Sequence, residues 1–459
     1  MTEPRTCRAS YSLFRRVASL LIGALPKALV SASVSLVFLL PLATQTVLGD
    51  PNYGSVDPVA EVRAVWLNAS SIPKTSREIR ALVAAYRRAN INVIFPEVVC
   101  RGYAVYPSRL LARDPRFAGA SDILADLIKE AHKRGLEVHA WVWVFRAGYA
   151  KDLGAILNAH PDWTEQGADG RDLSPNGGFW ISPANSQACE YLASVFRELV
   201  TSYDIDGVHL DYVRYEDESK IPFGYSECSK KLFEKQYGIE PPDSTSSPDD
   251  IHVYEWRKFR ERMVNAFVHR IALQTRSLKP RVKISAAVVP DPILARRKYM
   301  QNWLHWIDNK WLDFVVPMAY DSDDEHFGRV IANLKSTVNG KSIIVAGIGS
   351  NTLKADNQFI RQVAVSRKTG AHGQALFAAA YLCDVHLEAL QAIPYKAPAM
   401  LPFRNPRRVA EEILHKAAEQ VSKVDLWYAD YLTQRARDLI SYIGYIESST
   451  GYVRPTPPP

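Results

Sequence analysis

Short apolar runs and longer amphipathic stretches alternate along the chain from Glu61 onward. The short runs are rich in β-branched and aromatic residues, as buried strands are, whereas the longer stretches repeat apolar residues every three or four positions, as helices do. Eight strands that alternate with helices predict an α/β fold, a parallel sheet closed into a (β/α)8 TIM barrel. The predicted strands are residues 62–68, 92–98, 137–145, 208–213, 282–289, 313–320, 342–348 and 375–381. The clearest predicted helices are residues 76–89, 121–134, 188–202 and 254–277.

An open, doubly wound sheet is the alternative arrangement of the same elements. Such sheets, when they bind dinucleotides, carry a GxGxxG motif directly after the first strand. No such motif follows residues 62–68, which favours the closed barrel. The connection after the fourth strand is unusually long and contains Pro241-Pro242 and a Ser-, Thr- and Asp-rich stretch at 243–250. Long loops in compact domains are commonly functional.

The pattern changes after Leu390. A Pro-rich connector at residues 397–406 leads to two amphipathic helical stretches at 407–422 and 425–446. We therefore expect a barrel domain over residues 61–396 and a C-terminal helical extension over residues 397–459.

The first 49 residues have the layout of an export signal. Basic residues precede an apolar run at 28–40, and Pro41 and small or polar residues follow it. The apolar run is short for a membrane-spanning helix, which needs about 20 residues, so a cleaved signal is favoured over an uncleaved anchor. We expect an exported protein, periplasmic or extracellular, that contacts a membrane only through this segment if it is not cleaved. Arg15-Arg16 makes twin-arginine export one possible route.

The net charge of +7 does not indicate a nucleic-acid partner. Residues 1–49 alone contribute +4, so the remaining 51 Lys and Arg against 48 Asp and Glu leave only +3. Four cysteines remain beyond Cys7, which allows one or two disulfides or isolated thiols. No zinc-ligand spacing, phosphate-binding loop or GxSxG motif is present, so we expect no metal and no cofactor.

The most informative stretch is residues 203–216, YDIDGVHLDYVRYE. Side chains alternate along a strand, so Gly207, His209 and Asp211 share one face. A carboxylate that ends a buried strand is costly unless it has a partner or a role. Asp211 either forms an ion pair with Arg214 or belongs to an active site at the carboxyl ends of the strands, where barrel enzymes place their chemistry. The second interpretation is favoured.

Several short motifs stand in a fixed order along residues 61–390. They are RAVWLN (63–68), FPEV (95–98), RG (101–102), YPS (106–108), AHKRGLEVHAW (131–141), HPDW (160–163), WISP (180–183), DGVHLD (206–211) and VPMAY (316–320). With them, about seven-tenths of the chain resembles the glycosyl hydrolase-like 10 group, the bacterial (β/α)8 barrels called family 10-like glycosylhydrolases. Val99 and Tyr103 depart from it, since many relatives have Arg and Asp there, and the helices after Pro402 have no counterpart in the group.

The resemblance implies a glycoside hydrolase that cleaves O-glycosyl bonds of a bacterial polysaccharide, peptidoglycan glycan or an exopolysaccharide. Such hydrolysis needs two carboxyl groups on either side of the bond. Asp211 is the expected nucleophile or base, with His209 or Arg214 keeping it ionised or positioning a sugar hydroxyl. Glu97 and Asp291 are equal candidates for the second carboxyl, with Asp321 behind them. Each of the three acids could instead cap or brace a loop.

Aromatic and polar side chains near the predicted strand ends are the candidate sugar contacts. His139, Trp141 and Trp143 alternate on one face of the third strand, although His139 and Trp141 lie deeper and could be core residues. Arg101 could bind an acidic or acetamido-bearing sugar or brace a loop. The other candidates are Trp66, Asn68, Met318 and Tyr320. A non-catalytic glycan-binding barrel, and an envelope scaffold that binds through its C-terminal helices, are the alternative functions.

Overall fold

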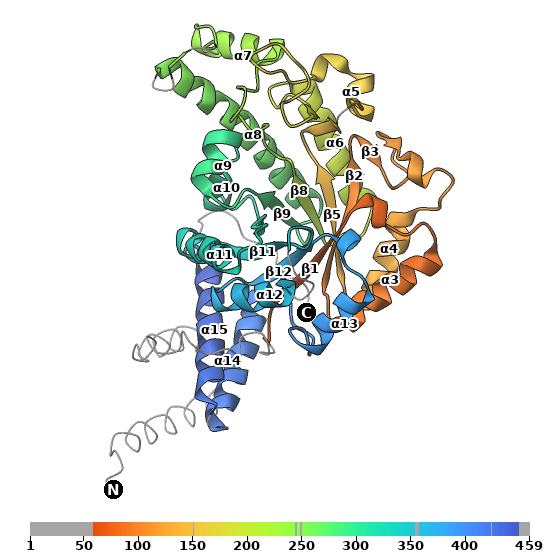
Figure 1. Ribbon diagram of the computed structural model, residues 1–459, viewed down its shortest axis with the longest axis vertical. Helices are drawn as coiled ribbons and strands as arrows, with labels where there is room; N and C mark the ends of the chain where they lie inside the picture. Colours follow the sequence, from red (N-terminus) through yellow and green to blue (C-terminus); the bar gives the residue numbers. More distant parts are fainter. Residues whose placement is uncertain are drawn as a thin grey trace.

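A computed structural model describes residues 58–149, 151–243, 246–247, 250–353, 358–423 and 425–448. The predicted export segment lies outside these residues. Eight parallel strands form a barrel, which the pairing of β1 with both β12 and β2 closes (Figure 1). They are β1 (Val62–Leu67), β2 (Val93–Cys100), β5 (Glu137–Trp143), β8 (Gly207–Asp211), β9 (Lys283–Val288), β10 (Phe314–Pro317), β11 (Ile343–Gly349) and β12 (Gly373–Phe377). The predicted barrel is thus confirmed.

Helices surround the barrel, and short elements decorate the loops between strands. The helices that follow the strands include α3 (Ser76–Arg88), α4 (Ile123–His132), α6 (Ser186–Ser202), α8 (Ile251–Leu278), α10 (Trp303–Asp308), α11 (Asp324–Val338), α12 (Gln358–Lys368) and α13 (Asp384–Ala392). The shorter elements include η2 (Ala69–Ser71), β3 (Tyr103–Ala104), β4 (Ala112–Arg113), η3 (Pro115–Phe117), β6 (Arg146–Tyr149), α5 (Ala155–Ala159), η4 (Pro161–Trp163), β7 (Gly178–Trp180), α7 (Glu227–Tyr237), α9 (Pro292–Tyr299) and η5 (Ala379–Tyr381).

The barrel interior is filled by the inward-facing side chains of the strands. Trp66, Phe95 and Phe314 belong to this inner cluster, whereas the outward-facing residues pack against the helices. The register pairs Glu97 with Trp141, and Trp143 with Asp211. Because inward positions alternate along each strand, Glu97 and Asp211 both point into the barrel near the carboxyl ends of β2 and β8.

The C-terminal extension closes the opposite end of the barrel. It consists of α14 (Pro406–Ser422) and α15 (Leu426–Glu447), which Figure 1 shows at the far end of the molecule from α7. Phe403, which precedes them, is 1% exposed and stacks on the inward-facing Phe314 with ring centroids 4.8 Å apart. The Tyr442 hydroxyl donates to the carbonyl of Asp313 at 3.2 Å. The extension therefore shares one core with the barrel.

We expect Phe403→Ala to lower the free energy of unfolding by about 3–5 kcal/mol, because it removes a buried ring from the base of the barrel. Leu426→Ala, on a side chain of α15 that is 54% exposed, should change it by less than about 0.5 kcal/mol. Urea unfolding of both variants measures the difference. Equal stabilities would mean that the extension only rests against the barrel.

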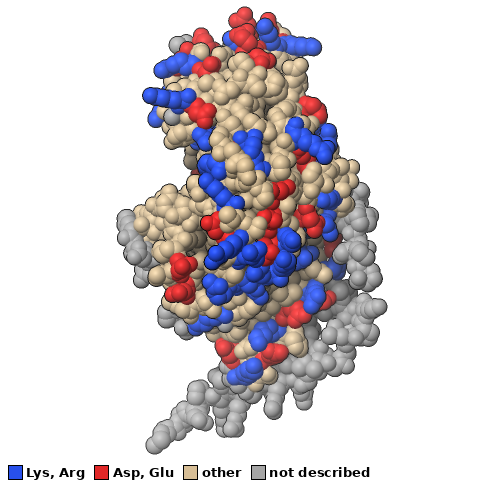
Figure 2. Space-filling model, turned by 90° about the vertical axis from the view of Figure 1, so that its right-hand side faces the viewer, with Lys and Arg blue, Asp and Glu red and all other residues tan. Residues whose placement is uncertain are grey.

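The outer wall carries many of the basic side chains. Figure 2 shows Lys and Arg gathered at mid-height on the face that holds α3 and α4, with acidic side chains among them. The exposed basic residues of these helices are Arg77, Arg80, Arg87, Arg88 and Lys129. This charge lies outside the ring of strands, away from the two inward-facing carboxyl groups.

The four described cysteines, Cys100, Cys189, Cys228 and Cys383, are free thiols, which agrees with the second of the two alternatives that the sequence allowed. Within the described part of the chain, no helix combines the length and apolarity needed to cross a membrane. The same residues contain no cluster of His, Cys, Asp and Glu suited to a metal ion.

Candidate active site

Two buried carboxyl groups face one another across β5 at the carboxyl ends of the strands. Glu97 is 5% exposed and Asp211 is 8% exposed. They lie on β2 and β8, whose backbones are two strand spacings, about 10 Å, apart across the sheet. Both side chains point inward. Trp141 lies on the strand between them and donates its Nε1–H to Asp211 Oδ2 at 3.0 Å.

The backbone around Asp211 holds its carboxylate in place. The N–H of Tyr212 donates to Asp211 Oδ1 at 2.7 Å. Tyr212 has φ of +49°, a left-handed conformation that residues other than glycine seldom adopt. This conformation ends β8 two residues earlier than the sequence predicts. Strained residues of this kind cluster at functional sites.

Glu97 is positioned by the start of a neighbouring loop. The backbone N–H of Ala69, directly after β1, donates to Glu97 Oε2 at 2.7 Å. Burial raises the pKa of Glu97 to about 6, and the negative charge of Asp211 adds to the increase, while hydrogen bonds from Ala69 and Cys100 oppose it. Glu97 therefore keeps its proton to a higher pH than an exposed glutamate does.

Two hydrogen bonds and two cations favour the ionised form of Asp211. Burial nevertheless raises its pKa above the usual value, and the bonds from Tyr212 and Trp141 and the positive charges of Arg214 and Arg146 only reduce this increase. A protonated carboxyl beside an ionised one is the division of labour that glycoside hydrolysis requires. No ion pair joins Asp211 and Arg214 within the described chain, so the purely structural interpretation of Asp211 loses its expected contact.

Three of the predicted sugar contacts are core residues instead, namely Trp66, His139 and His209. His209 is fully buried, stacks on Phe95 at 4.4 Å and accepts a hydrogen bond from Trp66 Nε1 at 3.1 Å. Burial lowers its pKa well below the usual value, so it is neutral and does not hold Asp211 ionised by charge. His139 is also fully buried and bonds to Glu137 at 3.0 Å. All lie below the carboxyl groups, because alternation fixes the face of a side chain but not its depth.

Trp141 and Arg101 also have other roles than the sequence predicts. Trp141 is 3% exposed, which leaves its hydrogen bond to Asp211 as its contribution to the site. Arg101 donates to Asp152 at 2.9 Å, so its guanidinium already has a carboxylate partner.

The other two candidate acids have structural roles in the loops that follow β9 and β10. Asp291 is exposed and caps the N-terminus of α9 by accepting from the backbone N–H groups of Ile293 and Leu294. Asp321 is bound by the ring of His326 and by the N–H of Asp323, and these bonds lower its pKa. An acid donor needs a raised pKa, which Glu97 has and Asp321 does not.

Asn68, Trp143, Met318 and Tyr320 do lie near strand ends and are partly exposed. Trp143 packs against Tyr212 with ring centroids 4.7 Å apart, and its buried Nε1–H has no hydrogen-bond partner. Tyr320 stacks on Phe377 at 5.2 Å. Their contact with a sugar stays a prediction that their placement permits.

Sequence reasoning missed Arg146 and Tyr212. Arg146 lies on β6, which pairs with β7, and the guanidiniums of Arg146 and Arg214 both lie over the Tyr212 ring. Partners so far apart in the chain leave no local signal.

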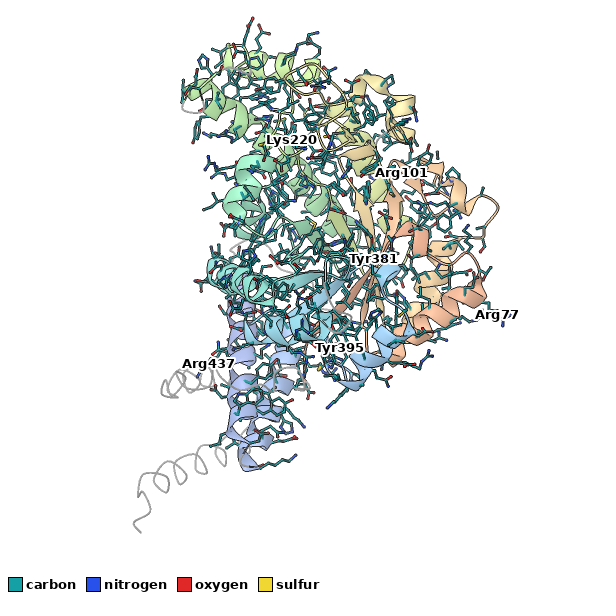
Figure 3. All side chains as sticks on the ribbon, viewed as in Figure 1. Arg77, Arg101, Lys220, Tyr381, Tyr395 and Arg437 are labelled. Carbon is teal, nitrogen blue, oxygen red and sulfur yellow. The ribbon has the colours of Figure 1, made fainter. Side chains whose placement is uncertain are left out.

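Figure 3 shows Arg101 and Lys220 towards the end of the molecule that carries α7, and Arg437 at the end that carries α15. Tyr381 follows β12 and is 50% exposed, which makes it a further candidate for stacking on a sugar.

Solved structures with similar folds are sugar-cleaving barrels. The glycoside hydrolase domain of PgaB from Bordetella bronchiseptica aligns with a TM-score of 0.56 at 16% identity, over 72% of this chain and 98% of that domain. The α-L-fucosidase isoenzyme 2 of Paenibacillus thiaminolyticus aligns with a TM-score of 0.54 at 16% identity, over 72% of this chain and 48% of the other. At these identities the likeness concerns the fold.

Relatives in sequence are named as glycosyl hydrolases. YngK of Bacillus subtilis is 26% identical over 62% of this chain and 59% of its own length. DigH of Escherichia coli K12 is 25% identical over 51% of this chain and 55% of its own length. An S-layer-related protein of Niallia circulans is 23% identical over 62% of this chain and 21% of its own length. The chain thus spans less than two thirds of each of these curated relatives.

The model of the glycosyl hydrolase-like 10 family matches residues 61–348, more than half of the chain. The match covers β1 to β11 and includes both inward-facing carboxyl groups. With its barrel and its sequence relatives, this chain belongs to the glycosyl hydrolase-like 10 family.

Proposed function

We propose that the protein is an exported hydrolase that cleaves O-glycosyl bonds of a cell-envelope or extracellular polysaccharide. The observation that carries the proposal is the pair of buried carboxyl groups, Glu97 with a raised pKa beside Asp211, at the carboxyl ends of the strands. Family membership and the barrel neighbours agree with it.

In the proposed mechanism Glu97 donates its proton to the oxygen of the leaving sugar, because its pKa of about 6 keeps it protonated in mildly acidic surroundings. Asp211 then attacks the anomeric carbon or activates a water molecule. The hydrogen bonds from Trp141 and Tyr212 fix the orientation of its carboxylate. The separation of the two carboxyl groups with a sugar bound decides between retention and inversion of configuration.

The proposed substrate class rests on two observations. The first 49 residues predict export, and one relative is named as an S-layer-related protein, so an envelope glycan is the substrate we propose. Peptidoglycan glycan and exopolysaccharide are the two forms of this proposal.

Release of new reducing ends from peptide-free peptidoglycan strands and from β-linked glycans by the purified protein tests the function. We expect turnover on at least one of them. Binding without any release would favour the non-catalytic glycan-binding barrel. The envelope scaffold has less support, because α14 and α15 bury side chains against the barrel.

We expect Trp143→Ala to weaken glycan binding by about 1–2 kcal/mol, since the partly exposed indole is lost as a stacking surface. Trp311→Ala, at a partly exposed tryptophan just before β10 at the other end of the barrel, should bind glycan as the wild type does. Calorimetric titration and melting temperatures distinguish the two roles. Normal binding by a much less stable Trp143→Ala protein would place Trp143 in the core.

A further inference from the structure

Two arginines lie over the ring of the tyrosine that follows Asp211. The guanidinium carbons of Arg146 and Arg214 lie 5.0 and 5.2 Å from the centroid of the Tyr212 ring. Both also contact the ring of Trp180, at 5.9 and 5.4 Å. Aromatic faces hold a guanidinium in a fixed plane without neutralising its charge. The aromatic rings therefore orient two cations beside the proposed catalytic carboxylate.

Neither arginine has a carboxylate partner among the described residues. Arg146 donates to the Tyr212 hydroxyl at 3.3 Å, and Arg214 donates to the carbonyl of Tyr215 at 3.2 Å. The Nε atoms of both are buried and have no hydrogen-bond partner. A buried donor without an acceptor is costly, so an unpaired guanidinium in this setting calls for an explanation.

Three arginines of neighbouring segments are paired with a carboxylate. Arg101 binds Asp152 at 2.9 Å, Arg171 binds Asp169 at 2.7 Å, and Arg260 binds Glu218. Arg146 and Arg214 differ from these three arginines, because neither forms an ion pair among the described residues.

Besides Asp211 itself, one acidic candidate for a partner of Arg214 is already occupied. Glu216 influences Arg214 by charge, but its carboxylate accepts four hydrogen bonds and forms no ion pair with it in the described chain. The donors are Ser174 Oγ, Trp180 Nε1, Asn176 Nδ2 and the N–H of Asp217. Both guanidiniums therefore keep donors for a group from outside the chain.

We propose that Arg146 and Arg214 form a subsite for a carboxylate carried by the glycan, next to the sugar on which Asp211 acts. This inference rests on the proposed function and specifies its substrate class as an acidic glycan. A planar guanidinium matches a carboxylate with two parallel hydrogen bonds, and two of them can bind both oxygens. The carboxylate of a uronic acid and the lactyl carboxylate of muramic acid both fit this chemistry.

Three oligosaccharides test the subsite in calorimetric titrations at low salt. Chito-oligosaccharide is neutral, hyaluronan oligosaccharide carries uronates, and peptide-free peptidoglycan strands carry lactyl carboxylates. The titrations use a Glu97→Gln background, which prevents turnover and keeps the charge of Asp211. We expect at least one acidic glycan to bind about tenfold or more tightly than the neutral one, as charge-assisted hydrogen bonds permit.

Arg146→Gln and Arg214→Gln should each remove most of this preference while changing the affinity for chito-oligosaccharide less than about twofold. Arg171→Gln is the matched control, since it removes an equal charge from an exposed position. Arg146→Lys keeps the charge but not the planar fork, and should retain part of the preference. It replaces Arg146→Gln in the test if that variant folds poorly.

Equal affinity for neutral and acidic glycans, or a preference that survives both arginine variants, would overturn the subsite. If the protein is not a hydrolase but the subsite exists, the result differs: the wild type would bind acidic glycans with the same arginine dependence and release no reducing ends. The acidic glycan with the larger preference identifies which carboxylate the site accepts.

Discussion

Asp211→Asn is expected to fold and to lose at least about 10²-fold in kcat on the glycan that the wild type cleaves. The substitution keeps the volume of the side chain and removes the charge that attacks the anomeric carbon or activates water. Asp211 accepts from both Trp141 Nε1 and the N–H of Tyr212. An asparagine amide satisfies only one of them, so a loss of about 1–2 kcal/mol in stability should accompany the loss of turnover.

Asp291→Asn is the matched control for this variant. Asparagine is as good an N-cap as aspartate, so α9 should keep its cap and the enzyme its activity. Measuring kcat and the melting temperature on the same preparations separates the two roles of Asp211. Substantial activity in an unstable Asp211→Asn protein would mean that Asp211 is structural.

Glu97→Gln is expected to abolish most turnover and to stabilise the protein above neutral pH. An amide cannot donate the proton that the leaving oxygen needs, which should lower kcat by about 10²-fold or more. The pKa of Glu97 is raised from 4.5 to about 6, so ionising it destabilises the folded state by roughly 2 kcal/mol once the pH exceeds about 6. Glutamine removes this cost and can still accept from the N–H of Ala69.

The size of this stabilisation depends on pH. Below about pH 4 Glu97 is protonated in the folded and the unfolded states, so the stabilisation by glutamine should disappear there. Urea unfolding at pH 8 and pH 4 measures both values, with Glu388→Gln on the exposed side of α13 as the control. The wild-type kcat/KM should fall as the pH rises through about 6, and on the acid side as Asp211 takes up a proton. A rate that stays constant between pH 5 and 8 would exclude Glu97 as the acid.

The barrel and the positions of Glu97 and Asp211 were predictable because both depend on local patterns. Alternation along a buried strand places an inward side chain, and parallel strands bring their carboxyl ends together. The choice between Glu97 and Asp291 was also present in the sequence, since Asp291 precedes Pro292, and aspartate before proline is a common start of a helix. Depth was predictable only in part: the sequence allowed His139 to be a core residue, but His209 was assigned to the site although it fills the barrel.

The features that the sequence did not predict depend on contacts between segments that are distant in the chain. Arg146 contacts aromatic rings from β5, β7 and the loop after β8, and no local sequence pattern predicts these contacts. Phe403 stacks on Phe314, which lies 89 positions earlier in the chain. The sequence therefore did not predict that the C-terminal extension forms the base of the barrel. Side-chain chemistry near one strand end indicated an active site, but only the register of several strands showed which groups meet.

A crystal structure of the Glu97→Gln protein with a bound glycan tests the two-carboxylate account most directly. We predict that one glycosidic oxygen lies within hydrogen-bond distance of the residue 97 side chain, with the anomeric carbon facing Asp211. A carboxyl separation of about 5–5.5 Å would imply retention of configuration, and about 6.5–9.5 Å inversion. A glycan whose bonds all lie away from these two side chains, or a separation outside both ranges, would contradict the mechanism.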